Sequence, residues 1–132
     1  MEMRISSKGK YALELMVYLG RNYGKGSISI SEITGDSFSV KYMEKIAALL
    51  NKAKLIKSER GVEGGYKLVK DPSEYSIFEI LDAVEDNMAP IKCVLDDDAC
   101  KIKITCKTYP IWDELYEIEA RFLKEKKLTD IL

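Results

Sequence analysis

Apolar residues recur at helical spacing near the start of the chain. They predict a first helix within residues 11–19, and the polar, glycine-containing run 20–26 ends it. Ser29 and Glu32 then match a capping box, in which each side chain satisfies a free backbone N–H of the other residue, so a short second helix follows. The apolar positions of the first helix are Ala12, Leu15, Met16 and Leu19.

Two further helices follow the same rules. Ser39 can cap a third helix that runs to about Ala53 with one broad apolar face. Ser76 and Glu79 form a second capping-box match that opens a fourth helix, which we expect to end at residues 88–90. The apolar face of the third helix consists of Tyr42, Met43, Ile46, Ala47, Leu49 and Leu50.

Between the third and fourth helices the pattern changes to short strands. Residues 55–59 and 66–69 are strand-like and flank the glycine-rich run 60–65, which predicts a β-hairpin with a flexible tip. The fold class is therefore mainly α with a small β-hairpin.

The last helix begins near Pro110 and has a narrow apolar stripe. Ile111, Leu115, Ile118 and Phe122 are spaced four, three and four residues apart on an otherwise charged helix, as in a coiled-coil seam. The helix can fold back on its own domain or pair with a second subunit. We favour a homodimer, because the stripe follows an acidic segment that does not resemble core.

Charge divides the chain into two unlike halves. The net charge is only -1, but residues 1–70 contain 13 Lys and Arg against 7 Asp and Glu, while residues 71–132 contain 8 against 15. A basic half of charge +6 that suits a polyanion is thus joined to an acidic half of charge -7. With 46% hydrophobic and 33% charged residues, the chain should form one folded unit with an appendage.

The N-terminal residues do not predict export or membrane insertion. They lack the apolar core of a signal peptide, and no apolar run reaches the roughly 18 residues that a membrane span requires. We therefore expect a cytoplasmic protein without a membrane partner. In that compartment the three cysteines are expected to be reduced, metal-bound or redox-sensing rather than locked in disulfides.

The order of three helices, strand, glycine-rich turn and strand is that of a winged helix-turn-helix, which binds double-stranded DNA. The third helix of such a module enters the major groove, and the hairpin, or wing, reaches the adjacent backbone or minor groove. Lysines can bind phosphate or guanine, a tyrosine can bind phosphate, and a glutamate can accept from cytosine. The candidate DNA-binding residues are Ser39, Lys41, Tyr42, Glu44, Lys45, Arg60, Gly61 and Gly64.

Four stretches resemble the Rrf2 family of bacterial winged-helix transcription regulators. They are residues 3–12, the Ser-x-x-Tyr-Met-Glu run at 39–44, the Arg-Gly-x-x-Gly-Gly-Tyr wing at 60–66, and residues 80–85. The resemblance implies a homodimer joined by the long last helix, with two recognition helices on a roughly palindromic site. It carries over DNA contacts to Lys41, Tyr42, Glu44, Lys45 and Arg60, although the two lysines replace smaller polar residues in many members.

All three cysteines lie within one acidic segment, at Cys93, Cys100 and Cys106, and the chain has no histidine. Thiolates are the usual ligands of iron-sulfur clusters, but this spacing alone is not specific, and zinc would require a fourth ligand. In the resembled family three cysteines in this segment bind a cluster, which implies an iron-sulfur cofactor here. Tyr109 stands where many members have a histidine. The fourth ligand could be Tyr109, one of Asp96, Asp97 and Asp98, a carboxylate of the partner chain or a small thiol.

Two alternatives to a cluster are open. Cys93 and Cys100 could form a disulfide on oxidation, or the segment could respond to a partner protein, although the carboxylates at 96–98 disfavour thiolates. The segment could also be a loop without an effector.

An enzyme is not expected. The chain lacks a histidine for a Ser-His or Cys-His arrangement, and it has no phosphate-binding loop followed by Lys-Ser or Lys-Thr. A dimeric adaptor that uses the winged fold to bind protein is the remaining alternative class. The expected organisation is a DNA-binding domain at 1–87, a cysteine-containing sensor segment at 88–109, and a dimerisation helix and tail at 110–132.

Overall fold

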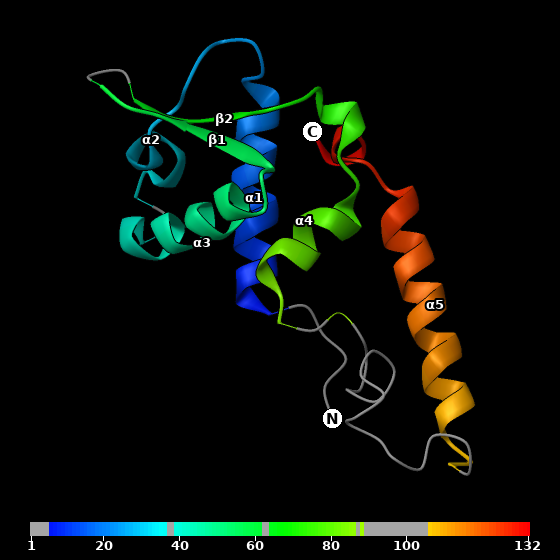
Figure 1. Ribbon diagram of the computed structural model, residues 1–132. Coiled ribbons are helices and arrows are strands. Elements are labelled where there is room, and N and C mark those ends of the chain that lie inside the picture. Colours follow the sequence, from blue (N-terminus) through cyan, green and yellow to red (C-terminus); the bar gives the residue numbers. More distant parts are fainter. Residues whose placement is uncertain (1–5, 37–38, 62–63, 87, 89–105) are drawn as a thin grey trace.

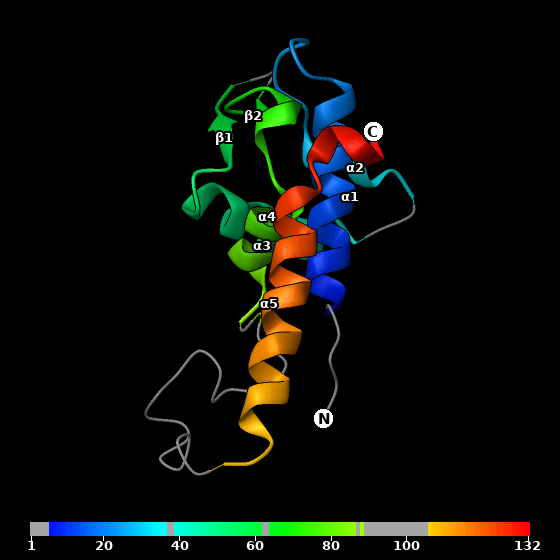
Figure 2. The ribbon, with the colours of Figure 1, turned by 90° about the vertical axis from the view of Figure 1, so that its right-hand side faces the viewer.

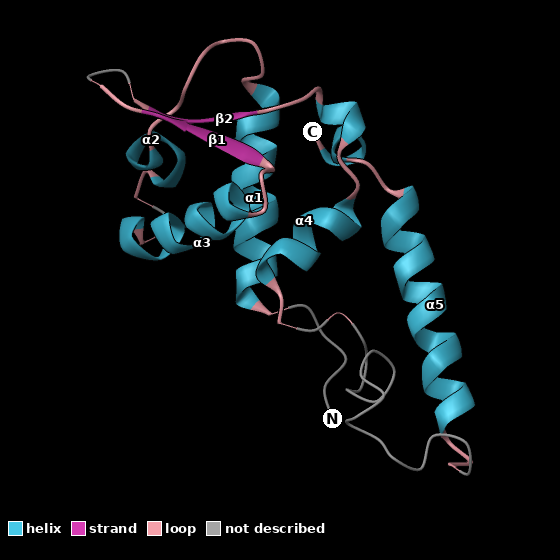
Figure 3. Ribbon diagram, viewed as in Figure 1, coloured by secondary structure: helices cyan, strands magenta, loops and turns pink. Residues whose placement is uncertain are grey.

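The computed structural model describes residues 6–36, 39–61, 64–86, 88 and 106–132 of the chain. These residues form helices and one two-stranded antiparallel sheet (Figure 3), so the predicted fold class is confirmed. Cys93 and Cys100 lie outside the described residues. The elements are α1 (Ser7–Arg21), α2 (Ile30–Thr34), α3 (Val40–Lys52), β1 (Ile56–Glu59), β2 (Gly65–Leu68), the 3-10 helix η1 (Pro72–Glu74), α4 (Ile77–Val84), α5 (Tyr109–Glu125) and the 3-10 helix η3 (Leu128–Ile131).

Serine hydroxyls begin three of the helices, as the sequence predicted. Ser29 Oγ accepts from the N–H of Glu32 at 3.3 Å, Ser39 Oγ from that of Tyr42 at 3.2 Å, and Ser76 Oγ from that of Glu79 at 3.1 Å. Each such cap stabilises its helix by about 1 kcal/mol. The starts of α2, α3 and α4 are therefore set by local chemistry.

The first helix is longer than predicted and the fourth is shorter. α1 already begins at Ser7, and α4 ends at Val84 rather than at residues 88–90. The fourth helix stops because Glu85 takes an extended backbone conformation, with φ -84° and ψ 143°.

The core lies where α1, α3 and α4 meet. Each helix contributes apolar side chains that are fully buried, and α1 contacts both α3 and α4. Burying one Leu, Ile or Met side chain stabilises the fold by about 1.5–3 kcal/mol, so this junction supplies much of the driving force for folding. The buried side chains at this junction include Leu15, Met16, Met43, Ile46, Leu50 and Ile80.

The hairpin is attached to the segment before α2. β1 and β2 pair from Ile56 with Leu68 to Glu59 with Gly65, and Ile28 adds a bridge to Tyr66 through two backbone hydrogen bonds of 2.9 Å. A Cβ atom on Gly65 would collide with the backbone carbonyl of Ile28. Glycine is thus required at position 65 by close packing of backbones.

Tyr75 joins the hairpin to the end of the chain. Its side chain is fully buried, and its hydroxyl donates to the Leu55 carbonyl at 2.6 Å and accepts from the Val69 N–H at 3.0 Å. Its own carbonyl accepts from the N–H of Leu128 at 3.0 Å, and Leu128 is itself fully buried. Burial raises the pKa of the Tyr75 phenol, which therefore stays protonated and able to donate.

The wing and α5 occupy opposite sides of the molecule. In Figure 1 the hairpin tip and the N-terminal end of α3 lie on the left, while α5 lies on the right beside α4. Figure 2 agrees, since α5 stands in front of α1, α3 and α4 when the right-hand side faces the viewer. Among the described residues, no helix has the length and apolar character needed to cross a membrane.

Candidate nucleic-acid interface and cysteine segment

The first turns of α3 present a polar face to solvent. Lys41, Glu44 and Lys45 are exposed, and the residues between and after them, Met43 and Ile46, are buried in the core. This alternation follows from the helical period, because residues 43, 46, 47 and 50 share one face. The predicted recognition residues of α3 thus lie on the exposed face of a helix whose opposite face packs in the core.

Tyr42 is half-buried at the edge of this face. Its hydroxyl lies 3.3 Å from Ser7 Oγ of α1, and its ring meets that of Tyr11 edge-on with centroids 5.1 Å apart. Ser39, the N-cap residue of α3, is also exposed. The first turn of α3 is therefore attached to α1 by side-chain contacts that the apolar pattern did not predict.

The wing tip needs glycine at two positions for two different reasons. Gly61 has φ +117°, a conformation that side chains rarely allow. Gly64 donates its N–H to the Gly61 carbonyl at 3.0 Å, and a Cβ there would lie 2.6 Å from the Glu59 carbonyl oxygen. Both predicted glycines thus shape the turn, and Arg60, which precedes it, is exposed.

The carboxylate next to Arg60 is already engaged. Glu59 pairs with Lys67 across the hairpin and accepts from Ser27 Oγ at 2.6 Å. The hydrogen bond from Lys67, then that from Ser27, lowers the pKa of Glu59. Because Lys67 balances this charge, Arg60 can face a phosphate without its neighbour repelling the same anion.

A surface hollow lies between the wing and the loop before α2. It is lined by Lys25, Ser29 and Glu32 on one side and by Glu59, Arg60 and Gly61 on the other. Lys25 therefore lies across the same hollow as the wing arginine. The sequence pattern did not single out this lysine, because its loop is joined to the hairpin by contacts between distant residues, the Ile28–Tyr66 bridge and the Ser27–Glu59 hydrogen bond.

Cys106 is the described member of the three cysteines, and it lies just before α5. It is half-buried, and its Sγ lies 3.4 Å from Thr108 Oγ1. The Thr108 hydroxyl, then the backbone N–H groups of Thr108 and Tyr109, lower the pKa of this thiol. Tyr109 is the first residue of α5, three positions after Cys106.

The predicted convergence of the three cysteines lies outside the described residues, which include Cys106 but not Cys93 and Cys100. Within the part of the chain that is described, no three Cys, Asp or Glu side chains form a group that could hold a metal ion.

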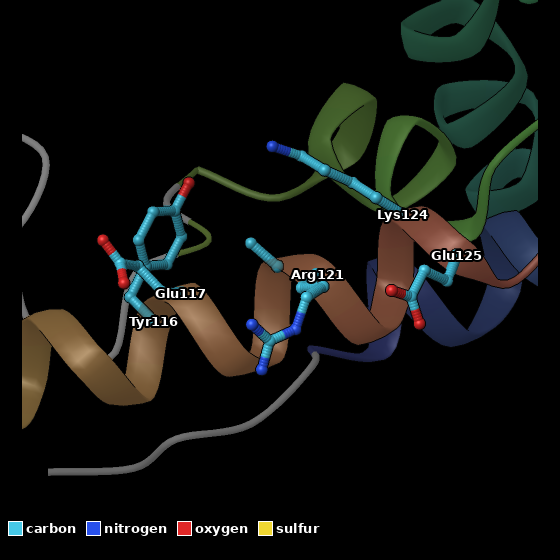
Figure 4. Close-up of a pocket in the computed structure, with 6 residues that line it drawn as sticks. Tyr116, Glu117, Arg121, Lys124 and Glu125 are labelled. Atoms are coloured by element: carbon cyan, nitrogen blue, oxygen red, sulfur yellow. The ribbon is translucent and has the colours of Figure 1, made fainter.

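Two opposite faces of α5 have different surroundings. One face of α5 lies against α4 and contains three residues spaced four apart, Tyr116, Ala120 and Lys124. Burial, then Asp82 of α4, raises the pKa of Tyr116. Lys124 Nζ lies 4.7 Å from the centre of the ring of Phe78, also in α4. Ala120 is buried, and Figure 4 shows Tyr116 and Lys124 projecting toward the same side of α5 while Arg121 projects away. On the other face, Ile111, Ile118 and Phe122 are 61%, 47% and 56% exposed.

Most of the apolar stripe therefore does not cover the chain's own core. Residues two apart on a helix are about 200° apart around its axis, so Ile118 and Phe122 point away from buried Ala120, while Leu115 of the stripe is half-buried. The helix does fold back on its own domain through the face that packs on α4, and pairing with a second subunit stays a prediction.

Comparisons with known proteins agree with this architecture. The family model Rrf2, described as an iron-dependent transcriptional regulator, matches residues 5–132. IscR, an HTH-type transcriptional regulator of Klebsiella pneumoniae, is 30% identical over 98% of this chain and 80% of its own length. CymR, the global cysteine regulator of B. subtilis, has a TM-score of 0.76 and 28% identity over 97% of this chain and 95% of that chain. IscR of T. potens also has a TM-score of 0.76 and 28% identity, over 97% and 85%.

Proposed function

Because this chain belongs to the Rrf2 family of transcription regulators, we propose that it binds double-stranded DNA as a homodimer and changes its affinity in response to the cysteine segment. The observation that supports DNA binding best is the arrangement of α3 and the wing. Both elements lie on the side of the molecule away from α5 (Figure 1), and each has exposed cations. The expectation that the chain is not an enzyme agrees with its relatives, which are transcription regulators.

Each element has a distinct task on DNA. The N-terminal turns of α3 enter the major groove, where Lys41 and Lys45 meet phosphate or guanine and Glu44 accepts from a cytosine amino group. Arg60 enters the neighbouring minor groove, whose negative potential is largest where the groove is narrow. Lys25, across the hollow from Arg60, adds a phosphate contact beside the wing.

The homodimer is formed through α5. In the apolar stripe of α5, Ile111, Ile118 and Phe122 are exposed and Leu115 is half-buried. The opposite face already packs on α4, so a second copy is the partner that would bury the stripe. Covering these side chains removes apolar surface from water, and the coiled-coil spacing of the stripe suits a helix with the same spacing. Two copies would then present two α3 helices and two wings to successive half-sites.

The group that changes DNA affinity is an iron-sulfur cluster held by Cys93, Cys100 and Cys106. The described member fits this role: the Thr108 hydroxyl and nearby backbone N–H groups lower the pKa of Cys106, which favours the thiolate form that binds iron. Tyr109, in the first turn of α5, is the candidate for the fourth position. A bound cluster supplies redox sensitivity, and the iron-dependent description of the family supports this assignment.

The position of Cys106 explains how a signal could reach DNA. Cys106 lies three residues before the first residue of α5. Just beyond the other end of α5, the N–H of Leu128 donates to the carbonyl of Tyr75, whose side chain is bonded to the hairpin. A change at the cysteines therefore acts on the helix that sets the spacing of the two α3 helices. A coupling of about 1–3 kcal/mol would change DNA affinity about 5- to 150-fold.

A second candidate input is thiol chemistry without a metal or through a partner protein. Its support is the likeness to CymR, the global cysteine regulator of B. subtilis. The two inputs differ in what the purified protein contains. Protein purified without oxygen should contain iron and acid-labile sulfide and absorb in the visible range, and each single Cys→Ser substitution should remove both. Colourless protein that stays free of iron and sulfide after reconstitution would leave only the thiol input.

DNA binding itself is tested by a mobility-shift titration with the duplex of highest affinity recovered from a random-sequence library. We expect binding that weakens steeply as salt rises, since cations of the protein displace counterions from phosphates. Failure to recover any preferred duplex would favour the alternative class, a dimeric adaptor that binds protein. As a bacterial transcription regulator, the protein would act in the cytoplasm, where the DNA is.

A further inference from the structure

The first turn of α1 is held by a side chain from the end of α4. Ser6 occupies the N-cap position of α1, but its hydroxyl makes no cap bond to its own helix. Instead its N–H and its hydroxyl both donate to Glu85 Oε1, at 2.9 and 2.7 Å. Hydrogen bonds to a carboxylate are stronger than neutral ones, and a negative charge is favourable beside a helix N-terminus. Glu85 thus fixes where α1 begins.

The next residue of α1 reaches the candidate recognition helix. Ser7 Oγ lies 3.3 Å from the Tyr42 hydroxyl, and Tyr11, one turn further along α1, places its ring edge-on against the Tyr42 ring at 5.1 Å. Ser7 and Tyr11 share one face of α1 because they are four residues apart. Tyr42 is therefore held at its hydroxyl and at its ring by two successive turns of the same helix.

This arrangement leaves the Tyr42 hydroxyl able to bind DNA. A hydroxyl has one proton and two acceptor lone pairs, and either hydroxyl of the Ser7–Tyr42 pair can be the donor. When Ser7 donates, the Tyr42 proton is free for a phosphate oxygen, and accepting one hydrogen bond strengthens the bond that the same hydroxyl donates. A phenol already held in place also loses less side-chain entropy when DNA binds.

We propose that Ser7 and Glu85 are positioning residues for DNA recognition: Glu85 fixes the first turn of α1 through Ser6, and Ser7 in that turn orients the hydroxyl of Tyr42 toward the phosphate backbone. The inference rests on the proposed function, since it requires α3 to meet DNA. It assigns a role in recognition to a residue of α1 and to the residue that follows α4, which lie outside α3 and the wing, the elements proposed to contact DNA.

The first test needs no DNA. In protein labelled with ¹³C at tyrosine, the Tyr42 signal is assigned by its loss in Tyr42→Phe. Ser7→Ala and Glu85→Gln should each shift the Tyr42 signal and leave that of Tyr75, which is buried against the hairpin, unchanged. An unmoved Tyr42 signal in both variants would overturn the proposed positioning.

The second test is a double-mutant cycle on the duplex selected from the random library. Ser7→Ala should weaken binding about 3- to 10-fold, the range of one hydrogen bond, while Ser7→Thr, which keeps the hydroxyl, should restore it. In the presence of Tyr42→Phe, Ser7→Ala and Glu85→Gln should each have an effect of less than about twofold. Ser73→Ala removes another exposed serine hydroxyl, from η1, and serves as the matched control with unchanged binding.

The outcomes separate the two levels of the proposal. Equal losses from Ser7→Ala with and without Tyr42→Phe would mean that Ser7 acts independently of Tyr42, which overturns the positioning role while DNA binding stands. A wild-type chain that binds no duplex would overturn the proposed function itself.

Discussion

The α3–wing side and the α5 side are both exposed, but their chemistry is opposite. On the first side the exposed residues of α3 and the wing include the cations Lys41, Lys45 and Arg60, held over a buried core. On the second side the exposed residues include the apolar Ile118 and Phe122, on a helix whose other face packs on α4. Exposed cations are favourably hydrated in the free protein and can also attract a polyanion. An exposed apolar stripe is unfavourably hydrated until another apolar surface packs against it.

The difference teaches how one small chain can have two partners. The charged side suits a partner that is bound reversibly and in a salt-dependent way, as we propose for DNA. The apolar side suits a permanent partner with a matching stripe, as we propose for a second copy. Tyr75 lies between them, because its hydroxyl bonds the hairpin and its carbonyl bonds Leu128, just beyond α5.

The largest effect is expected on the apolar side. Ile118→Lys places a charge within the stripe, and removing a lysine from water without a partner opposes association, so the protein should become monomeric. Loss of the second DNA-binding unit should reduce DNA affinity by at least about 100-fold, because avidity is lost. Sedimentation and anisotropy measure the two effects.

The control for Ile118→Lys is Glu117→Lys, which puts the same side chain at the neighbouring exposed position, off the stripe. It should leave the dimer intact. A dimer that persists in Ile118→Lys would contradict the assignment of α5.

The junction between the two sides should show the next largest effect. Tyr75→Phe removes a hydroxyl that satisfies the Leu55 carbonyl and the Val69 N–H, so it should lower the free energy of unfolding by about 2 kcal/mol. Tyr23→Phe, at a tyrosine that is 47% exposed, should change that free energy by less than about 0.5 kcal/mol. Denaturant titration compares them, and equal stabilities would show that the buried hydroxyl does not hold the wing.

On the charged side, Arg60→Ala should weaken DNA binding about tenfold without unfolding the protein, because one groove contact of this kind contributes about 1–3 kcal/mol. Arg21→Ala removes the same charge from the exposed end of α1 and is the matched control. A mobility-shift titration at fixed salt measures both variants. Equal affinities for Arg60→Ala and wild type would exclude the wing contact.

The smallest effect is a pH dependence at Glu59, in the strand pair next to the wing tip. Lys67 and Ser27 lower the pKa of Glu59 in the folded state, so its contribution to stability is present above the ordinary carboxyl range and is lost as pH falls through the folded pKa. The difference in melting temperature between wild type and Glu59→Gln should therefore shrink from neutral to strongly acidic pH. A difference independent of pH would contradict this assignment.

Local patterns were sufficient to predict much of this architecture. Ser39 and Ser76 predicted the starts of α3 and α4, because a cap involves residues only three apart. The glycine-rich run 60–65 predicted the turn of the wing for the same reason. Asp71 and Glu74 form a capping box at η1; its Asp-x-x-Glu pattern is equally local, but no helix was predicted there.

Contacts between distant residues could not be predicted in this way. The Ser6–Glu85 pair spans 79 positions and the Ser7–Tyr42 pair spans 35, and neither has a periodic signal. The Ile28–Tyr66 bridge, which brings Lys25 to the wing, likewise depends on packing of the whole chain. The domain boundaries and the convergence of the three cysteines stay predictions, since residues 89–105 lie outside the described structure.

The salt dependence of DNA affinity tests the central claim most directly. We predict a steep negative slope of log affinity against log salt for the wild type, which decreases in magnitude by about 0.9 for each phosphate-binding cation removed at Lys41, Lys45 or Arg60. Lys52→Ala, at the far end of α3, should leave the slope unchanged. A slope near zero in the wild type, or one that is the same in all these variants, would contradict DNA binding through α3 and the wing.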